Sequence, residues 1–400
     1  MKNFERRVKK LRTSMARLPD KLTTIAARLS RNPIGGAHPP IAFKVDGGMG
    51  DHIIAARFIR DIAASIEGLQ FDIYCKRPKI MQWLMASVPG CNLIGEKKMD
   101  IKMLRRRYRY VFNTVTFVQV VHDRSRKRRA ANPAEVALDK LAKLITLSCK
   151  PIQMYIHNHP QLDGYLGHYT VLKESNRHRY LHVQASLPYT GDLLDIEVDA
   201  EILKRLALQG QQYITMSNGY DELVETNSST KLNTKVYPHY SEVALQLKAA
   251  MPGVKLVQIG TTTSTPIQGI DVDLIGKTSL PEVAAILKHA QLHIDNEGGL
   301  VHLAASVGTR ACVIFGPTLA DYFGYETNLN IAPKECGSCW WMEPTWMVKC
   351  VKGYEKPVCM HATEPDSVAN RILEHLRPRQ QLKSIASIAP SPVQANSAQA

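Results

Sequence analysis

The sequence predicts an α/β protein built from two doubly wound domains. Short apolar runs alternate with helical patterns in two separate stretches of the chain, which is typical of parallel sheets covered by helices. A length of 400 residues favours two cores over one, and 44% hydrophobic residues can fill both. In this fold class ligands bind beyond the carboxyl ends of the strands. The loops that follow the predicted strands are therefore the candidate sites.

Residues 1–40 are predicted to form a basic amphipathic helical segment. They hold ten Lys or Arg against Glu5 and Asp20, and apolar residues recur every three or four positions. Pro19 interrupts this pattern, which predicts two short helices. A helical hairpin that docks on the protein or pairs between subunits fits the pattern. A cationic face that lies on an anionic membrane fits it equally well.

The formal net charge of +15 indicates a negatively charged partner or surface. Two more basic runs, at residues 105–109 and 124–129, place three basic clusters in the first third of the chain. No apolar run approaches the roughly 20 residues that cross a bilayer, and the first residues lack the apolar stretch of a signal peptide. A cytoplasmic protein is the simplest expectation.

The first domain is predicted over residues 41–200. Its strands are "PPIAFKVD", "FDIYC" and "YRYVFNTV", and "HIIAARFIRDIAAS" is the helix after the first strand. Between that strand and that helix, Gly47, Gly48 and Gly50 let the backbone approach a ligand. Asp51 follows at the helix N-terminus, whose dipole favours the ionised carboxylate. A tight turn with Asp51 as the N-cap is the plainer interpretation of these residues alone.

The second domain is predicted over residues 205–335. Its strands are "QYITMS", "VKLVQIG", "AQLHID" and "RACVIFG", separated by helical patterns such as "YSEVALQLKAAM", "LPEVAAILKHA" and "GLVHLAASVG". The stretch "SSTKLNTKVYP" joins hydroxyl groups, Thr234 among them, to Lys231 and Lys235 just before a helix. This combination suits a phosphate group. A polar surface loop is the alternative.

The stretch "DNEGGLVHLAASVGT" is a second candidate phosphate site. A strand ends at Asp295, Gly298 and Gly299 open a helix, and His302 lies in its first turns. Such a helix start presents bare backbone N–H groups to a pyrophosphate. A structural histidine is the alternative for His302. The next strand-end loop, "FGPTLADYFGY", adds the hydroxyl of Thr318.

Residues 336–360 form a predicted Cys-rich insert. Two residues, then ten, then eight separate its four cysteines, which suits a tetrahedral thiolate site for structural Zn or Fe. These cysteines are Cys336, Cys339, Cys350 and Cys359. Reduced free thiols are the alternative. The tryptophans of this segment could pack it against the protein body or line the acceptor side of the site. A C-terminal helix is predicted over 361–378 and a disordered tail over 379–400.

Together these loops resemble glycosyltransferase family 9, the heptosyltransferase-like enzymes of lipopolysaccharide biosynthesis. "GGMGDHII" looks like the family's Gly-x-Gly-Asp-type turn, and "TKVYP" is similar to its Lys-x-Trp-Pro. The stretch from "DLIGKTSL" to "VIFGPT" resembles the family's most recognisable block, and "CMHATEPDSV" resembles a common family ending. The resemblance covers roughly residues 41–376. The chain departs from the family at Glu297, where Asp is usual, and at Tyr237, where Trp is usual.

The resemblance implies a GT-B fold, in which two Rossmann-like domains face a central cleft. It implies an inverting transfer, without a catalytic metal, from a nucleotide-sugar to a lipopolysaccharide or other surface-glycan acceptor. ADP-heptose is the favoured donor, and Asp51 would be the general base. The residues expected to bind the donor are Lys231, Thr234, Lys235, Glu297, Gly298, Gly299, Leu300, His302 and Thr318. Cysteine inserts similar to residues 336–360 occur in part of the family.

The acceptor is expected to be an anionic glycolipid or polysaccharide. The basic N-terminal third would then contact the inner face of a bacterial inner membrane, and a homo-oligomer stays open. Two other classes of protein fit part of the pattern. A non-catalytic glycosyltransferase-like scaffold would bind the donor without turnover. A nucleic-acid-binding protein with a zinc site would explain the charge, but the basic runs flank a nucleotide-sugar scaffold rather than track one groove.

Overall fold

The computed structural model describes residues 40–96, 101–121, 130, 132–220, 234–262 and 264–377. Several sequence predictions lie outside these residues. They are the helical segment before residue 40, the basic run at 124–129, the predicted phosphate contact Lys231 and the C-terminal tail. Within the described part of the chain, no helix is both long enough and apolar enough to cross a membrane.

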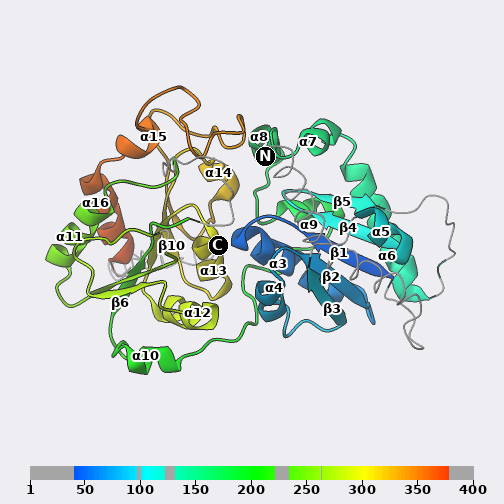
Figure 1. Cartoon of the computed structure of the whole chain (residues 1–400), viewed down its shortest axis with the longest axis horizontal. Helices are drawn as coiled ribbons and strands as arrows, with labels where there is room; N and C mark the ends of the chain where they lie inside the picture. The colour runs from blue at the N-terminus through cyan, green and yellow to red at the C-terminus, as the bar shows by residue number, and fades with distance from the viewer. Residues whose placement is uncertain are drawn as a thin grey trace, which may run out of the picture. The chain divides into compact units, whose positions relative to one another are not determined.

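The first sheet has five strands in the order β3-β2-β1-β4-β5 (Figure 1). Its first four strands are parallel, and β5 runs antiparallel to β4. The strands are β1 (Ile41–Val45), β2 (Phe71–Cys75), β3 (Cys91–Glu96), β4 (Tyr110–Thr114) and β5 (Val118–Val121). The helices of this half are α3 (Met49–Ser65), α4 (Pro78–Leu84), α5 (Ile101–Arg107), α6 (Pro133–Ser148), α7 (Gln153–Asn158), α8 (Asp163–Leu172) and α9 (Tyr180–Ala185).

The second sheet has six strands in the order β11-β10-β9-β6-β7-β8, and every pair is parallel. The strands are β6 (Tyr213–Met216), β7 (Lys255–Gly260), β8 (Val272–Ile275), β9 (His293–Asn296), β10 (Ala311–Ile314) and β11 (Leu329–Ile331). The helices are α10 (Glu201–Arg205), α11 (Tyr240–Ala250), α12 (Leu280–His289), α13 (Gly299–Ser306), α14 (Ala320–Phe323), α15 (Val358–His361) and α16 (Pro365–Leu376).

Helices cover both faces of the first sheet, as the alternation of its side chains requires. On one face Phe43 meets Phe71 and Phe112 edge-on, with ring centroids 5.6 Å apart, and this cluster includes apolar residues of α3. On the other face Ala42 packs with Leu104 of α5. Strands buried on both faces must be apolar along their length, which is why they were recognisable in the sequence. The predicted doubly wound α/β fold is confirmed.

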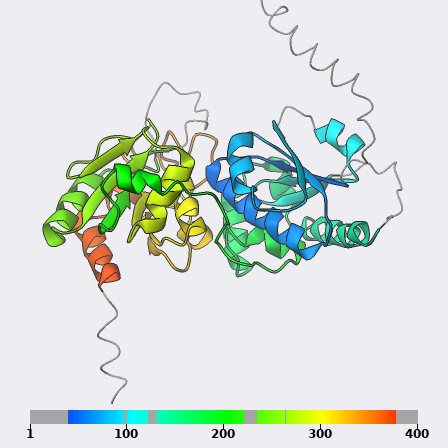
Figure 2. The same ribbon diagram turned by 90° about the horizontal axis from the view of Figure 1, so that it is seen from below.

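Helices α3 and α13 lie side by side where the two halves of residues 40–377 meet (Figure 1; Figure 2). One buried apolar cluster runs from the first sheet through α3 and α12 to Tyr213 and Val257 of the second sheet. The junction is therefore packed like a protein core. It brings the loop after β1 close to the loop after β9, which are two of the four loops that the sequence singled out.

Helix α3 begins earlier than its sequence pattern indicated. The N-cap is Gly48 in an extended conformation, and Met49 is the first helical residue. Asp51 is therefore the third residue of the helix, and its interpretation as the N-cap was wrong. The cause is that Gly48 can cap a helix without a side chain. The predicted C-terminal helix begins at Pro365 and ends at Leu376, inside its expected range.

Candidate functional site at the junction of α3 and α13

Asp51 is fixed by its own helix start. Its Oδ2 accepts a hydrogen bond of 2.9 Å from the backbone N–H of Gly48, so the carboxylate satisfies a donor that the helix leaves unpaired. Gly47 has φ +102°, a left-handed conformation that favours glycine. A Cβ at Gly47 would lie 2.2 Å from Asp51 Oδ2. The glycine turn thus shapes the space that the carboxylate occupies.

Arg177 holds the other oxygen of Asp51. It lies between α8 and α9, its side chain is 1% exposed, and its Nη2 donates to Asp51 Oδ1 at 2.6 Å. The same Nη2 also donates to the carbonyl of Val115 at 3.2 Å. Each carboxylate oxygen of Asp51 therefore has an N–H donor, yet the side chain remains 31% exposed. The result is an oriented carboxylate that a ligand can reach.

Sequence reasoning missed Arg177. Its segment, "SNRHRYLHV", has no periodicity that would mark one arginine as buried, and the pair with Asp51 spans 126 positions. Only a chemical argument could have indicated such a residue. A carboxylate that must stay ionised in a partly buried site needs a cation or further hydrogen-bond donors nearby.

The starts of α3 and α13 meet without room for side chains. A Cβ at Gly50 would lie 2.5 Å from His302 Cδ2, and a Cβ at Gly299 would lie 2.8 Å from the Cε of Met49. Gly298 is the N-cap of α13, and no side chain caps its N–H groups. The α13 start therefore offers backbone donors and the positive end of the helix dipole to an anion.

We predict that Gly50→Ala destabilises the protein even though Gly50 is a helical residue. Alanine normally stabilises a helix by about 1 kcal/mol over glycine. The new methyl group would overlap the His302 ring, and overpacking costs about 1–3 kcal/mol. Urea unfolding measures the change. The control is Gly253→Ala, because nothing lies within 4 Å of a Cβ there. Equal stability of both variants would show that His302 moves aside freely.

Lys235 and Glu297, two of the residues expected to bind the donor, lie together. Lys235 Nζ is 2.5 Å from Glu297 Oε2, and both side chains are largely buried, at 17% and 9% exposure. Glu297 is in the turn between β9 and α13, next to Gly298. A cation and the uncapped α13 start thus flank the same turn.

The other predicted donor contacts differ in their surroundings. Thr234 donates its hydroxyl to the carbonyl of Trp346 at 2.7 Å and is 5% exposed, so this hydroxyl is engaged with the protein. Thr318 is 2% exposed in the loop after β10. Leu300 packs against the main apolar cluster, so only its backbone is suited to a ligand. Thr234 and Thr318 lie in loops and Leu300 lies in α13, and the sequence could not show which way their side chains point.

Three histidines near the junction are buried. Burial, with the positive charges of Arg57 and Arg177 next in effect, holds the pKa of His302 well below its ordinary value. Burial likewise lowers the pKa of His178 to about 3, and it lowers the pKa of His52. All three are therefore neutral at physiological pH. With these rings neutral, the positive charge that acts on His302 comes from Arg57, Arg177 and Lys235.

The structure does not support the predicted metal site. In the described ranges, no group of three or more His, Cys, Asp or Glu residues is placed to hold a metal ion. The four cysteines do gather. Burial raises the pKa of the Cys359 thiol to about 12, and Cys336, Cys339 and Cys350 add to the rise. The spacing thus predicted that the thiols lie near one another, but it could not supply the ligand geometry. Cys359 and Cys336 instead pack against the apolar core.

The Cys-rich segment is anchored by its tryptophans. Trp340 and Trp346 are buried in a cluster with Phe323, whose ring centroid is 4.9 Å from that of Trp340. Glycine at position 164, in α8, lets the Trp340 carbonyl approach, because a Cβ there would be 2.0 Å from its oxygen. Of the two roles considered for the tryptophans, packing against the protein body is the one observed for Trp340 and Trp346.

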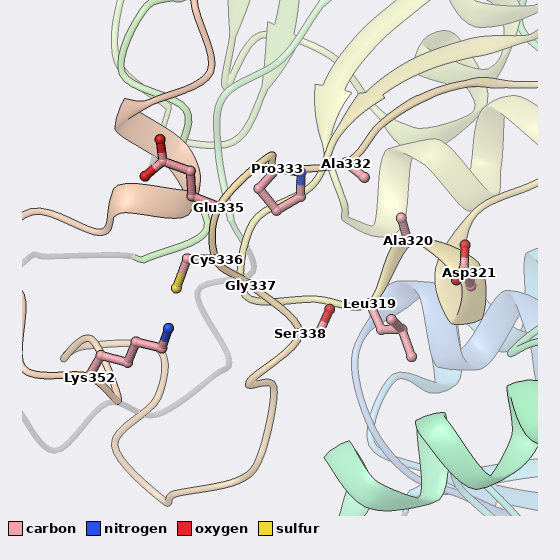
Figure 3. Close-up of a pocket in the computed structure, with 10 residues that line it drawn as sticks. All are labelled: Leu319, Ala320, Asp321, Ala332, Pro333, Glu335, Cys336, Gly337, Ser338 and Lys352. Carbon is pink, nitrogen blue, oxygen red and sulfur yellow. The ribbon is translucent and has the colours of Figure 1, made fainter.

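A pocket of about 410 Å³ opens beside this segment, between the loops after β10 and β11 (Figure 3). Its lining residues are Leu319, Ala320, Asp321, Ala332, Pro333, Glu335, Cys336, Gly337, Ser338 and Lys352. Asp51, Lys235 and His302 are not among them. The pocket is therefore separate from the site at the junction of α3 and α13.

The two sheets, their topology and the site at the strand ends define a GT-B architecture. Two solved structures share it at low sequence identity. The iron-containing dodecameric glycosyltransferase TibC of enterotoxigenic E. coli is 13% identical, with a TM-score of 0.52 over 85% of this chain and 76% of its own. A family 9 glycosyl transferase of Veillonella parvula is 15% identical, with a TM-score of 0.52 over 86% of this chain and 99% of its own.

Residues 176–339 match the model of glycosyltransferase family 9 (heptosyltransferase). This match confirms the predicted resemblance over these residues. Lipooligosaccharide heptosyltransferase 2 of Haemophilus influenzae is 26% identical over 100 residues, which are 22% of this chain and 29% of that protein. The chain thus matches less than a third of this relative's length. The family match, residues 176–339, includes Lys235, Glu297 and His302 but not Asp51. The roles of all four residues remain predictions.

Proposed function

We propose that this chain is an inverting glycosyltransferase, independent of a catalytic metal, with Asp51 as its general base. The observation that carries the proposal is the set of contacts and the exposure of the Asp51 carboxylate. Its two oxygens are held by Gly48 and Arg177, its side chain is 31% exposed, and its helix start packs against the uncapped start of α13. A family 9 region supplies the second half of this arrangement.

The proposed reaction needs one carboxylate. Asp51 takes the proton of the acceptor hydroxyl while the acceptor oxygen attacks the anomeric carbon from the face opposite the diphosphate. The bond between that carbon and the diphosphate oxygen breaks, and the nucleoside diphosphate leaves with the bonding electrons. The configuration at carbon is inverted. Positive charge and backbone donors stabilise the leaving group.

The donor diphosphate is assigned to the start of α13. The N–H groups after Gly298 lack a side-chain cap, and Lys235 pairs with Glu297, the residue just before Gly298. Because Lys235 pairs with Glu297 here, an incoming diphosphate would share this lysine with a carboxylate. We favour ADP-heptose as donor, since the TibC structure of matching fold was solved in complex with ADP-D-beta-D-heptose.

The acceptor is proposed to be a lipopolysaccharide or another anionic surface glycan at the inner face of the inner membrane. Helix α5 ends in Arg105, Arg106 and Arg107, which are exposed, while its Leu104 is buried. A row of cations on the first half of the protein suits a phosphorylated glycan or an anionic lipid surface. TibC is described as dodecameric, and a homo-oligomer is proposed for this chain on that analogy.

A donor panel tests the function. The purified full chain is incubated with ADP-heptose, ADP-glucose, UDP-glucose and GDP-mannose, each with and without a deacylated lipopolysaccharide acceptor. We expect ADP release and an acceptor heavier by one heptose with ADP-heptose, at a rate that EDTA leaves unchanged. No turnover of any donor would refute the proposal, and donor binding without turnover would identify a scaffold. Tight, strongly salt-dependent nucleic-acid binding without turnover would point to the third class.

A further inference from the structure

Arg57 is a fully buried arginine that the proposed reaction does not use. It lies in the middle of α3 with a side chain 0% exposed. Its Nη1 donates to Tyr325 Oη at 2.8 Å and to Asp192 Oδ1 at 3.2 Å. Its Nη2 donates to Ser306 Oγ at 2.9 Å and to the His302 carbonyl at 3.2 Å. The guanidinium thus ties α3 to α13 and to the loop after α14.

These contacts fix the direction of the hydrogen bond between Tyr325 and His302. A guanidinium has donors only, so the Tyr325 oxygen must accept from Arg57. The hydroxyl proton of Tyr325 then needs an acceptor, because Tyr325 is 1% exposed. His302 Nδ1 is 2.6 Å from Tyr325 Oη and can provide a lone pair. Tyr325 therefore donates, and His302 Nδ1 accepts.

The proton of His302 is consequently on Nε2. A neutral imidazole has one N–H, and Nδ1 is occupied as an acceptor. Burial and the neighbouring cations favour the neutral ring, as described above. The Nε2 edge faces the start of α3, because Nε2 is 3.1 Å from the position of a Cβ on Gly50. The ring edge that adjoins the start of α3, the helix that also carries Asp51, therefore has an N–H and no lone pair.

We propose that Arg57 and Tyr325 are positioning residues that hold His302 as a neutral Nε2–H donor toward an anionic oxygen of the donor diphosphate. The identity of the ligand in this inference rests on the proposed function, whereas the tautomer of His302 does not. A ring with Nε2 protonated cannot remove a proton from the acceptor, so His302 does not compete with Asp51 as the base.

The test compares two tyrosines. Tyr325→Phe removes the hydroxyl that orients His302. Tyr322→Phe is the matched control, because Tyr322 is equally buried and its hydroxyl has no hydrogen-bond partner among the described residues. Nitrogen-15 NMR of histidine-labelled full chain, with the His302 signal assigned by its loss in His302→Gln, reports which ring nitrogen carries the proton. The dissociation constant of ADP is measured for each variant.

We expect wild type and Tyr322→Phe to show His302 protonated at Nε2. Tyr325→Phe should shift the signal toward the Nδ1–H tautomer or a mixture, and weaken ADP binding about tenfold. A wild-type Nδ1–H tautomer, or identical behaviour of the two variants, would overturn the inference. Both readouts are independent of turnover. A normal tautomer and ADP response in a protein that consumes no donor would therefore refute the proposed function and leave this inference standing.

Discussion

Asp51→Asn is expected to lower kcat by a factor of about 100 to 10,000, the usual contribution of a general base. The amide cannot take the acceptor proton at neutral pH, so the attacking oxygen stays protonated. The donor binds at the α13 start in the proposed mechanism, so the dissociation constant of the nucleotide-sugar should change little. Initial rates of nucleoside diphosphate release and calorimetric donor binding measure the two quantities separately.

This substitution also has a structural cost that must be measured. Asn has one acceptor oxygen, whereas Asp51 accepts from Gly48 on one oxygen and from Arg177 on the other. The melting temperature of Asp51→Asn is therefore recorded with its rate. Asp46→Asn is the control, since Asp46 is a carboxylate of the same turn, bonded to the N–H of Gly47. Wild-type turnover by Asp51→Asn would remove Asp51 as the base.

The sequence predicted the backbone of this site better than its side-chain contacts. Parallel strands buried on both faces leave apolar runs, and Gly47, Gly48 and Gly50 mark a turn whose geometry is local. The capping bond between Asp51 and Gly48 spans three residues, so it was within reach of sequence reasoning. These features depend on residues that are close together in the chain, so they can be predicted from a single sequence.

The long-range contacts were not predictable in the same way. Arg57 reaches Tyr325 across 268 positions, and nothing in the pattern of α3 distinguishes it from Arg60, whose side chain is 22% exposed. Thr234 was expected to meet a phosphate, but its hydroxyl is bonded to the Cys-rich segment. Side-chain direction in a loop depends on which segments fold against it. Buried ionic contacts between distant segments therefore appear only in the structure.

Arg177→Met is expected to cost about 3 kcal/mol of stability and at least tenfold in kcat. Removing one partner of a buried ion pair leaves the other charge uncompensated, which costs about 3–5 kcal/mol. The lower end applies because Asp51 is 31% exposed and water can solvate part of its charge. Arg179→Met is the matched control, because Arg179 is two residues away with a side chain 44% exposed. Thermal unfolding and initial rates compare the two variants.

The double variant, Asp51→Asn with Arg177→Met, tests whether Arg177 only positions Asp51 or stabilises the transition state directly. If Arg177 acts on the reaction only by orienting the Asp51 carboxylate, Arg177→Met has no further catalytic effect once position 51 is already Asn. The kcat of the double variant should then stay close to that of Asp51→Asn, a strongly non-additive result. Losses that multiply would show that Arg177 stabilises the transition state on its own. The leaving diphosphate would then be the group through which Arg177 acts on the rate.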